Sequence, residues 1–248
     1  MTQEGTEARV ARNRWIDSLD NGSALQMMLE SHAAAADAVA AVLVQIESVV
    51  DAMVTRLAAD SRARIVYAGA GTSIRVAVQD GVELRPTFDW PAARLAYLVA
   101  GGDGALMNAV ENAEDDVEAA RREVEKLRLT ACDIVIALSA SGGTPFTCAV
   151  VEAALPSGAL TVGIANNDAT PLLERAMMAI PIVTGPEAVA GSTRLKAATA
   201  QKICLNMIST LVMTRLGYVK DGQMVAMKPS NAKLRARFER IHGGETAD

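Results

Sequence analysis

Aromatic side chains are scarce in this sequence. Only 3% of the 248 residues are Phe, Trp or Tyr, whereas 50% are hydrophobic and 21% are charged. A core with so few rings must be built mainly from Ala, Val, Leu, Ile and Met, and the hydrophobic share is large enough for a substantial core. The length allows one large domain or two small ones.

Histidine and cysteine are also few, and this argues against several kinds of catalytic site. The two histidines, His32 and His242, lie near opposite ends of the chain. We therefore expect no Ser–His–Asp or Cys–His device and no metal site. The cysteines Cys132, Cys148 and Cys204 are widely spaced and odd in number, which predicts reduced thiols and no disulfide framework. Acid–base chemistry would then have to use carboxylates, Lys or Tyr.

An excess of positive charge and long apolar runs are missing as well. The net charge is −5, which argues against a nucleic-acid partner. The first residues are polar, unlike a signal peptide. The longest Ala/Val-rich run, at 33–50, is interrupted by Asp37, Gln45 and Glu47, and it predicts an amphipathic helix instead of a membrane span. We expect a cytoplasmic protein without a membrane or nucleic-acid partner.

Apolar β-rich segments alternate with helical segments along the chain. Strands are expected at 64–68, 94–99, 133–138, 160–165 and 178–183. Helices are expected at 17–31, 33–59, 72–84, 104–126, from 145 onward, at 191–216 and at 231–242. This alternation predicts an α/β fold, a three-layer sandwich whose five-stranded parallel sheet is covered on both faces. We expect an N-terminal helical arm (1–60), a central domain (61–225) and a C-terminal helix and tail (226–248).

Two loops rich in Gly, Ser and Thr, at 69–73 and 139–144, follow buried strands and precede helices. In an open α/β sheet, ligands bind beyond the carboxyl ends of the strands, where helix N-termini offer N–H donors to anions. Both loops therefore predict phosphate binding, although an ordinary tight turn explains either loop alone. The first loop is not a dinucleotide motif, because Ile74 stands where a third glycine is needed, and no P-loop occurs.

A third hydroxyl-rich segment, at 191–196, opens the last long helix. Ser192 or Thr193 is the expected N-cap. Arg194 and Lys196 fall in the expected first turn, where cations oppose the helix dipole unless an anion lies nearby. This placement indicates an anion close to the helix start, with solvated surface charges as the alternative.

Two glutamates are candidates for acid–base chemistry. Glu83 lies near the C-terminal end of the helix that follows the first loop, where the dipole disfavours an acid. A salt bridge to Arg85 or a solvated charge also explains it. Glu114 belongs to an acidic run at 111–118 on the expected 104–126 helix. Its spacing does not distinguish it from its neighbours, and a solvated acidic face is the plain alternative.

Taken together, these segments resemble the N-acetylmuramic acid 6-phosphate etherases. The matching blocks are 69–73 with Glu83 and 86–88, then 101–102 with 109–115, 139–145, 185–187 with 191–202, and 205–210. The resemblance covers about 15–240 with similar spacing between blocks. It implies a flavodoxin-like fold of the sugar-isomerase (SIS) type, a homodimer with the site near the subunit interface, and a lyase that needs no cofactor.

The resemblance also implies an activity and a set of site residues. The family cleaves the D-lactyl ether at C3 of a phosphorylated amino sugar, N-acetylmuramic acid 6-phosphate. Glu83 is implied as the acid that assists departure of lactate, and Glu114 as the second acid–base group. The implied substrate-binding residues are Gly71, Thr72, Ser73, Ser139, Ser141, Gly142, Thr144, Glu187, Ser192, Arg194 and Lys196.

Several positions depart from the family pattern. Ile74 and Ala198 stand where the family has Gly, Gly143 stands where it has Arg, and 84–86 replaces Cys-Pro-Pro. We expect the added bulk and the lost cation to bear on the substrate, and we expect the family's small C-terminal helical domain to be missing. An aldose–ketose sugar-phosphate isomerase and a non-catalytic sugar-phosphate sensor, like the glucokinase regulatory proteins, are the alternative functions.

Overall fold

Five parallel strands form the central sheet of the computed structural model, which describes residues 5–225. The strands are β1 (Ile65–Gly69), β2 (Leu95–Val99), β3 (Ile134–Ser139), β4 (Leu160–Ala165) and β5 (Met178–Pro181). Their order in the sheet is β2-β1-β3-β4-β5. The expected parallel sheet is thus confirmed, with β5 slightly shorter than predicted. The helix expected at 231–242 lies outside the described residues.

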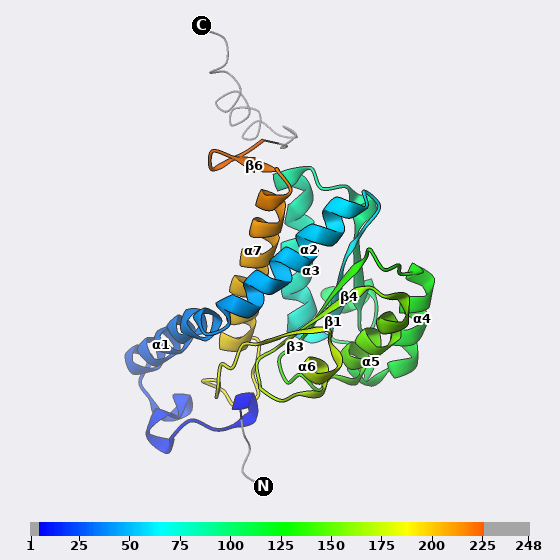
Figure 1. The fold of residues 1–248 in the computed structure, drawn as a ribbon. Coiled ribbons are helices and arrows are strands. Elements are labelled where there is room, and N and C mark those ends of the chain that lie inside the picture. Colours follow the sequence, from blue (N-terminus) through cyan, green and yellow to red (C-terminus); the bar gives the residue numbers. More distant parts are fainter. Residues whose placement is uncertain (1–4, 226–248) are drawn as a thin grey trace, which may run out of the picture.

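Helices cover both faces of the sheet, as Figure 1 shows. One face carries α1 (Asn21–Ala40), α2 (Leu43–Ala59), α3 (Gly71–Phe88) and α7 (Lys196–Arg215). The other carries α4 (Val117–Leu127), α5 (Pro145–Ala154) and α6 (Pro171–Arg175). A short hairpin of β6 (Val219–Lys220) and β7 (Gln223–Met224) follows α7. The three-layer α/β architecture is confirmed.

The strands form because their residues are apolar on both sides. Every residue of β1, β3 and β4 is buried, as expected for strands between two helical layers. Alternate side chains serve different layers: Ile65 and Tyr67 pack in the α2–α3–α7 core, whereas Val66 and Ala68 pack in the α4–α5 core. Burial of each large aliphatic side chain contributes about 1.5–3 kcal/mol, so polar groups are displaced to the sheet's edges.

The Ala-rich N-terminal region divides into α1 and α2 at a different place from the one expected. The break falls at Ala41 and Val42, where Val42 leaves helical geometry at φ −120° and ψ 21°. The two helices meet at 60°. No single helix within residues 5–225 has both the length and the apolar character that a bilayer crossing requires.

The long helix expected at 104–126 is wrong. After β2 the chain forms short 3₁₀ turns, η5 (Asp103–Leu106) and η6 (Ala113–Asp115), and only Val117–Leu127 is α-helical. Within this range Asn112 has φ +57°, a left-handed conformation that interrupts a helix. Asp116 then caps α4, because its carboxylate accepts a 2.8 Å hydrogen bond from the Ala119 N–H. The acidic run at 111–116 therefore lies mainly in a loop.

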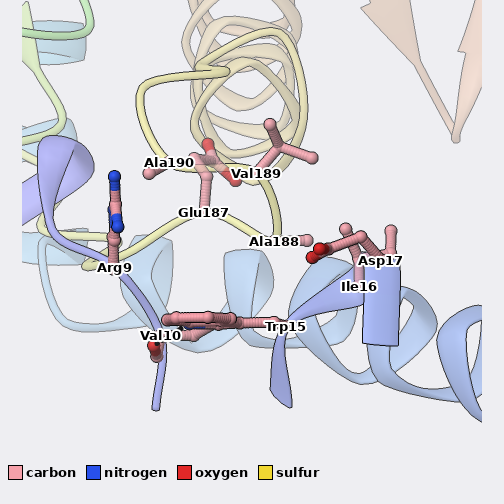
Figure 2. Close-up of a pocket in the computed structure, with 9 residues that line it drawn as sticks. All are labelled: Arg9, Val10, Trp15, Ile16, Asp17, Glu187, Ala188, Val189 and Ala190. Carbon is pink, nitrogen blue, oxygen red and sulfur yellow. Dashed lines mark hydrogen bonds between the residues drawn. The ribbon is translucent and has the colours of Figure 1, made fainter. Parts of the chain in front are cut away.

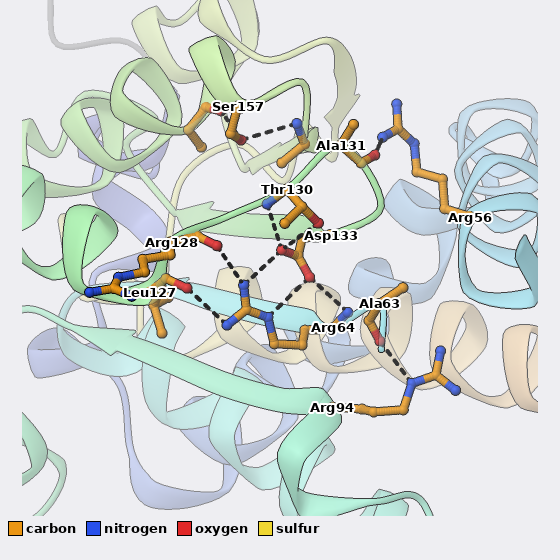
Figure 3. Close-up of polar contacts among 12 residues, drawn as sticks. Arg56, Ala63, Arg64, Arg94, Leu127, Arg128, Thr130, Ala131, Asp133 and Ser157 are labelled. Atoms are coloured by element: carbon orange, nitrogen blue, oxygen red, sulfur yellow. Dashed lines mark hydrogen bonds and ion pairs between the residues drawn. The ribbon is translucent and has the colours of Figure 1, made fainter. Parts of the chain in front are cut away.

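An ion pair between partly buried Arg64 and buried Asp133 joins the amino ends of β1 and β3 (Figure 3). The Asp133 carboxylate accepts hydrogen bonds from the Arg64 backbone N–H at 2.9 Å and from Arg64 Nε at 3.0 Å. It also accepts one from the Thr130 N–H at 2.8 Å. Burial by itself raises the pKa of Asp133, but the hydrogen bonds from Arg64 and Thr130 outweigh it, so the pKa lies below its ordinary value.

We expect Asp133→Asn to destabilise the protein by about 3 kcal/mol at pH 7, because it leaves the Arg64 charge without its partner. The stabilisation from the carboxylate is fully present above its unfolded pKa of about 3.9 and disappears as the pH falls through the lower folded pKa. Urea unfolding of the two proteins should therefore converge in acid. Exposed Asp51→Asn is the matched control, and equal stability of the Asp133 variant and wild type at pH 7 would contradict the expectation.

Candidate functional site

Three hydroxyl groups gather where β3 ends and α5 begins. Ser139 Oγ lies 2.8 Å from Thr144 Oγ1 and 3.2 Å from Ser141 Oγ, and it accepts a 3.0 Å hydrogen bond from the Gly142 N–H. Gly142 turns the chain with φ +71°. Pro145 occupies the first turn of α5, as expected, and the Thr144 side chain makes no capping bond. The first N–H groups of α5 therefore stay available to an anion.

The first Gly-rich loop lies beside this cluster. Gly69, the last residue of β1, pairs with Leu138 of β3, and a Cβ at Gly69 would come within 2.8 Å of the Leu138 carbonyl oxygen. Glycine thus allows the close approach of the two loops. Gly71 then opens α3, and Thr72 and Ser73 follow in the first turn. The structure brings these expected phosphate-binding residues to the same carboxyl edge of the sheet.

The expected N-cap of the last long helix is wrong. Helix α7 begins at Lys196, and neither Ser192 nor Thr193 caps it. Instead the buried Glu187 carboxylate accepts hydrogen bonds from the Lys196 N–H at 3.0 Å and from the Ala197 N–H at 2.8 Å. A carboxylate at this place satisfies free N–H groups and the positive end of the helix dipole. Glu187 was expected to bind substrate, and both of its oxygens are occupied by α7.

Lys196 is buried next to this cap, whereas Arg194 is exposed. Lys196 Nζ donates a 2.8 Å hydrogen bond to the Pro186 carbonyl oxygen. Burial lowers the pKa of Lys196, and the Glu187 charge partly offsets this effect. The sequence predicted an anion near the start of this helix. The Glu187 carboxylate of the same chain occupies that position. A cavity of about 460 Å³ beside Lys196 is also lined by Arg14 and Glu30.

The N-terminal segment forms a second pocket against the residues around Glu187 (Figure 2). Its volume is about 290 Å³. The Trp15 ring forms one wall, and the Trp15 Nε1–H donates to the Val10 carbonyl oxygen at 3.2 Å. The hydroxyl-rich residues 139–144 do not line this pocket. It was not predicted from the sequence, because its two walls lie far apart along the chain.

The two candidate glutamates occupy different places. Glu114 lies on η6, which packs against α5, so it is on the side of the molecule that carries the hydroxyl cluster. Glu83 lies on the exposed surface of α3, about three turns or 15 Å along the helix axis from Ser73. A single chain thus places Glu114 beside α5, the helix that follows the 139–144 loop, and places Glu83 far along α3 from its start.

A buried carboxylate that was not predicted lies one helical turn before Glu83. Asp80 is 3% exposed and accepts hydrogen bonds from Tyr67 at 2.9 Å, from Asn206 at 2.7 Å and from Ser209 at 3.1 Å. Lys202 in turn donates to Asn206 at 2.8 Å. The network joins α3 to α7 below the surface that carries Glu83. Among residues 5–225, no group of three or more His, Cys, Asp or Glu side chains is placed to hold a metal ion.

Sequence comparison finds close relatives over almost the whole chain. N-acetylmuramic acid 6-phosphate etherase of Streptomyces coelicolor is 45% identical over 91% of this chain and 72% of its own length. The enzyme of that name from Pectobacterium atrosepticum is 44% identical over 96% of this chain and 78% of its length. Residues 45–155 also match the model of the glucokinase regulatory protein N-terminal SIS domain.

Solved structures show the same SIS-type fold at low identity. A phosphoheptose isomerase from Francisella tularensis superimposes with a TM-score of 0.61 at 17% identity, covering 79% of this chain and 100% of that chain. A phosphoheptose isomerase from Neisseria gonorrhoeae gives a TM-score of 0.54, also at 17% identity, covering 75% of this chain and 94% of that chain. At such identities the likeness supports the fold alone.

The position of Glu187 predicts a stability effect. We expect Glu187→Ala to lower the free energy of unfolding by about 2 kcal/mol, because two N–H groups of α7 lose their acceptor. Glu187→Gln should cost less, since its amide oxygen can still accept one of these bonds. Urea unfolding followed by circular dichroism measures both. Glu174→Ala, at an exposed position, is the control, and a Glu187→Ala variant as stable as this control would refute the capping role.

Proposed function

This chain belongs to the N-acetylmuramic acid 6-phosphate etherase family, and from that premise we propose that it releases D-lactate from N-acetylmuramic acid 6-phosphate. The other product is N-acetylglucosamine 6-phosphate, and the reaction belongs to the recycling of cell-wall amino sugars. The observation that carries the proposal is the cluster of Ser139, Ser141 and Thr144 hydroxyls at the start of α5, with Glu114 on the adjoining η6.

The phosphate of the substrate is assigned to this cluster. Hydroxyl groups and the free N–H groups at the start of α5 are suited to phosphate oxygens, and the helix dipole favours the negative charge there. Ser141 is exposed at the tip of the turn, and Ser73 lies in the first turn of α3, which follows the neighbouring strand β1. We assign Gly71, Thr72 and Gly142 to the same subsite, and Arg194 and Ser192 to its outer rim.

The chemistry needs two carboxyl groups and no redox step. In the open-chain aldehyde, the C1 carbonyl acidifies the C2 proton, and a carboxylate takes this proton. The C2 electron pair then forms a C2–C3 double bond while the C3–O bond breaks, and a protonated carboxyl gives its proton to the departing lactyl oxygen. Water adds its hydroxyl at C3 and a proton returns to C2. We assign Glu83 to the departing lactate and Glu114 to the second acid–base role.

The proposed mechanism requires a homodimer. Glu83 lies about 15 Å along α3 from Ser73 of its own chain, so a second copy must bring its Glu83 to the phosphate loop. The surface around Glu83 supports such a contact, because Val82 is 50% exposed beside it and Leu211 of the adjoining α7 is 38% exposed. Burial of these apolar side chains would favour association.

Replacement of either glutamate tests the mechanism. We expect Glu83→Gln and Glu114→Gln each to reduce D-lactate release by about 10²-fold or more while substrate still binds, because the amide cannot exchange a proton. A coupled D-lactate dehydrogenase assay measures turnover, and calorimetry measures binding. Normal turnover in both variants would refute the mechanism. Tight binding by the wild type without lactate release would favour the sensor alternative.

Mixed dimers of these two inactive variants test the origin of Glu83. If Glu83 acts in the partner's site, a dimer with one Glu83→Gln and one Glu114→Gln chain has one intact site. Random exchange of subunits should then restore about a quarter of wild-type activity. If each chain contains its own Glu83 and Glu114 in one site, mixing restores nothing.

Gly143 stands where the resembled family has Arg, and we expect that restoring this arginine improves substrate binding. A Cβ at Gly143 would find only Ser141 Oγ, at 4.0 Å, so a side chain fits there. We expect Gly143→Arg to lower the KM for the phosphorylated substrate by about threefold to tenfold, since a guanidinium forms charge-assisted hydrogen bonds with phosphate. Gly143→Gln, which adds a shorter polar side chain without charge, is the control. An unchanged KM in the Arg variant would place the phosphate away from this loop.

A further inference from the structure

We propose that Asn167 is a positioning residue for the phosphate-binding turn, and that Thr6 of the N-terminal segment fixes the orientation of its amide. The inference deepens the proposed function and rests on it, because it concerns the same phosphate subsite. Asn167 follows β4, lies next to the turn at 139–144, and makes four hydrogen bonds that link the turn to the N-terminal segment.

The carbonyl oxygens of the turn are held by the segment that follows β4. Asn167 Nδ2 donates to the Ala140 carbonyl oxygen at 3.2 Å and, more weakly, to the Ser141 carbonyl oxygen at 3.5 Å. The Asn166 N–H donates to the Ala140 oxygen at 3.0 Å, and the Leu172 N–H donates to the Gly142 oxygen at 2.9 Å. Three successive carbonyl groups are thus engaged on one side of the turn.

This arrangement controls what the turn presents to an anion. The C=O and N–H of a trans peptide point in opposite directions, so a carbonyl held on one side directs the next N–H to the other. The Ser141 carbonyl, held by Asn167, directs the Gly142 N–H towards Ser139, where it donates to Oγ at 3.0 Å and to the carbonyl oxygen at 3.2 Å. The Gly142 carbonyl, held by the Leu172 N–H, directs the Gly143 N–H towards Ser141 Oγ at 3.2 Å. Carbonyl oxygens repel phosphate, whereas consecutive N–H groups and hydroxyls attract it. Asn167 therefore keeps the Ala140 and Ser141 carbonyl oxygens away from the proposed phosphate position.

Thr6 determines which end of the amide faces the turn. The Thr6 backbone N–H donates to Asn167 Oδ1 at 3.0 Å, and Thr6 Oγ1 accepts from Asn167 Nδ2 at 3.1 Å. A flipped amide would place Nδ2 against this N–H and Oδ1 against the carbonyl oxygens of the turn, which are unfavourable contacts. Thr6 is itself fully buried, and its carbonyl oxygen accepts from the Gly191 N–H at 3.1 Å.

The neighbouring glycine shows how close this contact is. A Cβ at Gly5 would come within 1.9 Å of Asn167 Oδ1, and Gly5 has φ +61°, so a larger residue would displace the N-terminal segment. Asn is also the suitable residue by charge. Its amide donates to carbonyl oxygens without adding a negative charge beside the bound phosphate, whereas an aspartate would repel both.

The test is the affinity for phosphate in variants of the full-length protein. We expect Asn167→Ala to raise the KM for N-acetylmuramic acid 6-phosphate and the Ki for inorganic phosphate by the same factor, about tenfold, with kcat within about threefold of wild type. Thr6→Val, which removes one acceptor, should have a smaller effect of the same kind. In the double variant the two effects should not add, since both act through one amide. Asp168→Ala, at the exposed next position, is the control.

A KM and a phosphate Ki within about twofold of wild type in Asn167→Ala, or a fall in kcat alone, would overturn the inference. If Asn167→Ala does not fold, the same comparison with Thr6→Val decides, and an unchanged phosphate Ki in that variant would overturn it. Calorimetric binding of N-acetylglucosamine 6-phosphate separates this inference from the proposed function. A wild type that binds the sugar phosphate but releases no D-lactate refutes the etherase activity, and the affinities of the variants still test Asn167.

Discussion

Helices cover both faces of the sheet, and this coverage determines where a polar site can lie. With β1, β3 and β4 buried at every residue, a polar side chain within these strands would have to be desolvated. Polar groups are therefore concentrated at the two edges. The amino edge is closed by the ion pair of Arg64 and Asp133, whereas the carboxyl edge carries the glycine and serine loops and the helix starts. The fold leaves one edge at which several N–H groups can converge on a ligand.

That carboxyl edge is assembled from residues that are far apart in the sequence. Glu187 caps α7 from a preceding loop, and Asn167 joins the turn at 139–144 to Thr6, which is 161 positions away. In both cases a side chain satisfies backbone groups that local structure leaves unpaired. The hydrogen bonds between Asn167 and Thr6 make the geometry of the turn depend on the N-terminal segment.

Features encoded locally were predictable from the sequence, and features that depend on tertiary contacts were not. The strands were predictable because parallel central strands are continuous apolar runs. The positions of the two Gly- and Ser-rich loops were predictable because these loops follow the runs directly, whereas phosphate binding by them stays a prediction. The prediction for 104–126 was wrong because the Ala and Glu content of this region favours a helix, whereas Asn112 with φ +57° interrupts one. No local sequence pattern predicts that Glu187 caps α7 or that Asn167 and Thr6 are joined by hydrogen bonds.

The positions that differ from the family pattern have different surroundings in the structure. Ile74 lies next to Gly69 of the first loop, but it is 1% exposed and packs in the core beneath β1, so its bulk is buried. Ala198 is likewise buried in α7. Gly143 alone lies on the open side of the turn, where it leaves a cation absent. A phosphate dianion held there without a guanidinium depends on N–H groups, hydroxyls and the helix dipole, which are weaker and more directional. Phosphate affinity in this chain should then depend more strongly on the geometry of the turn, and so on Asn167, than in relatives that carry the arginine.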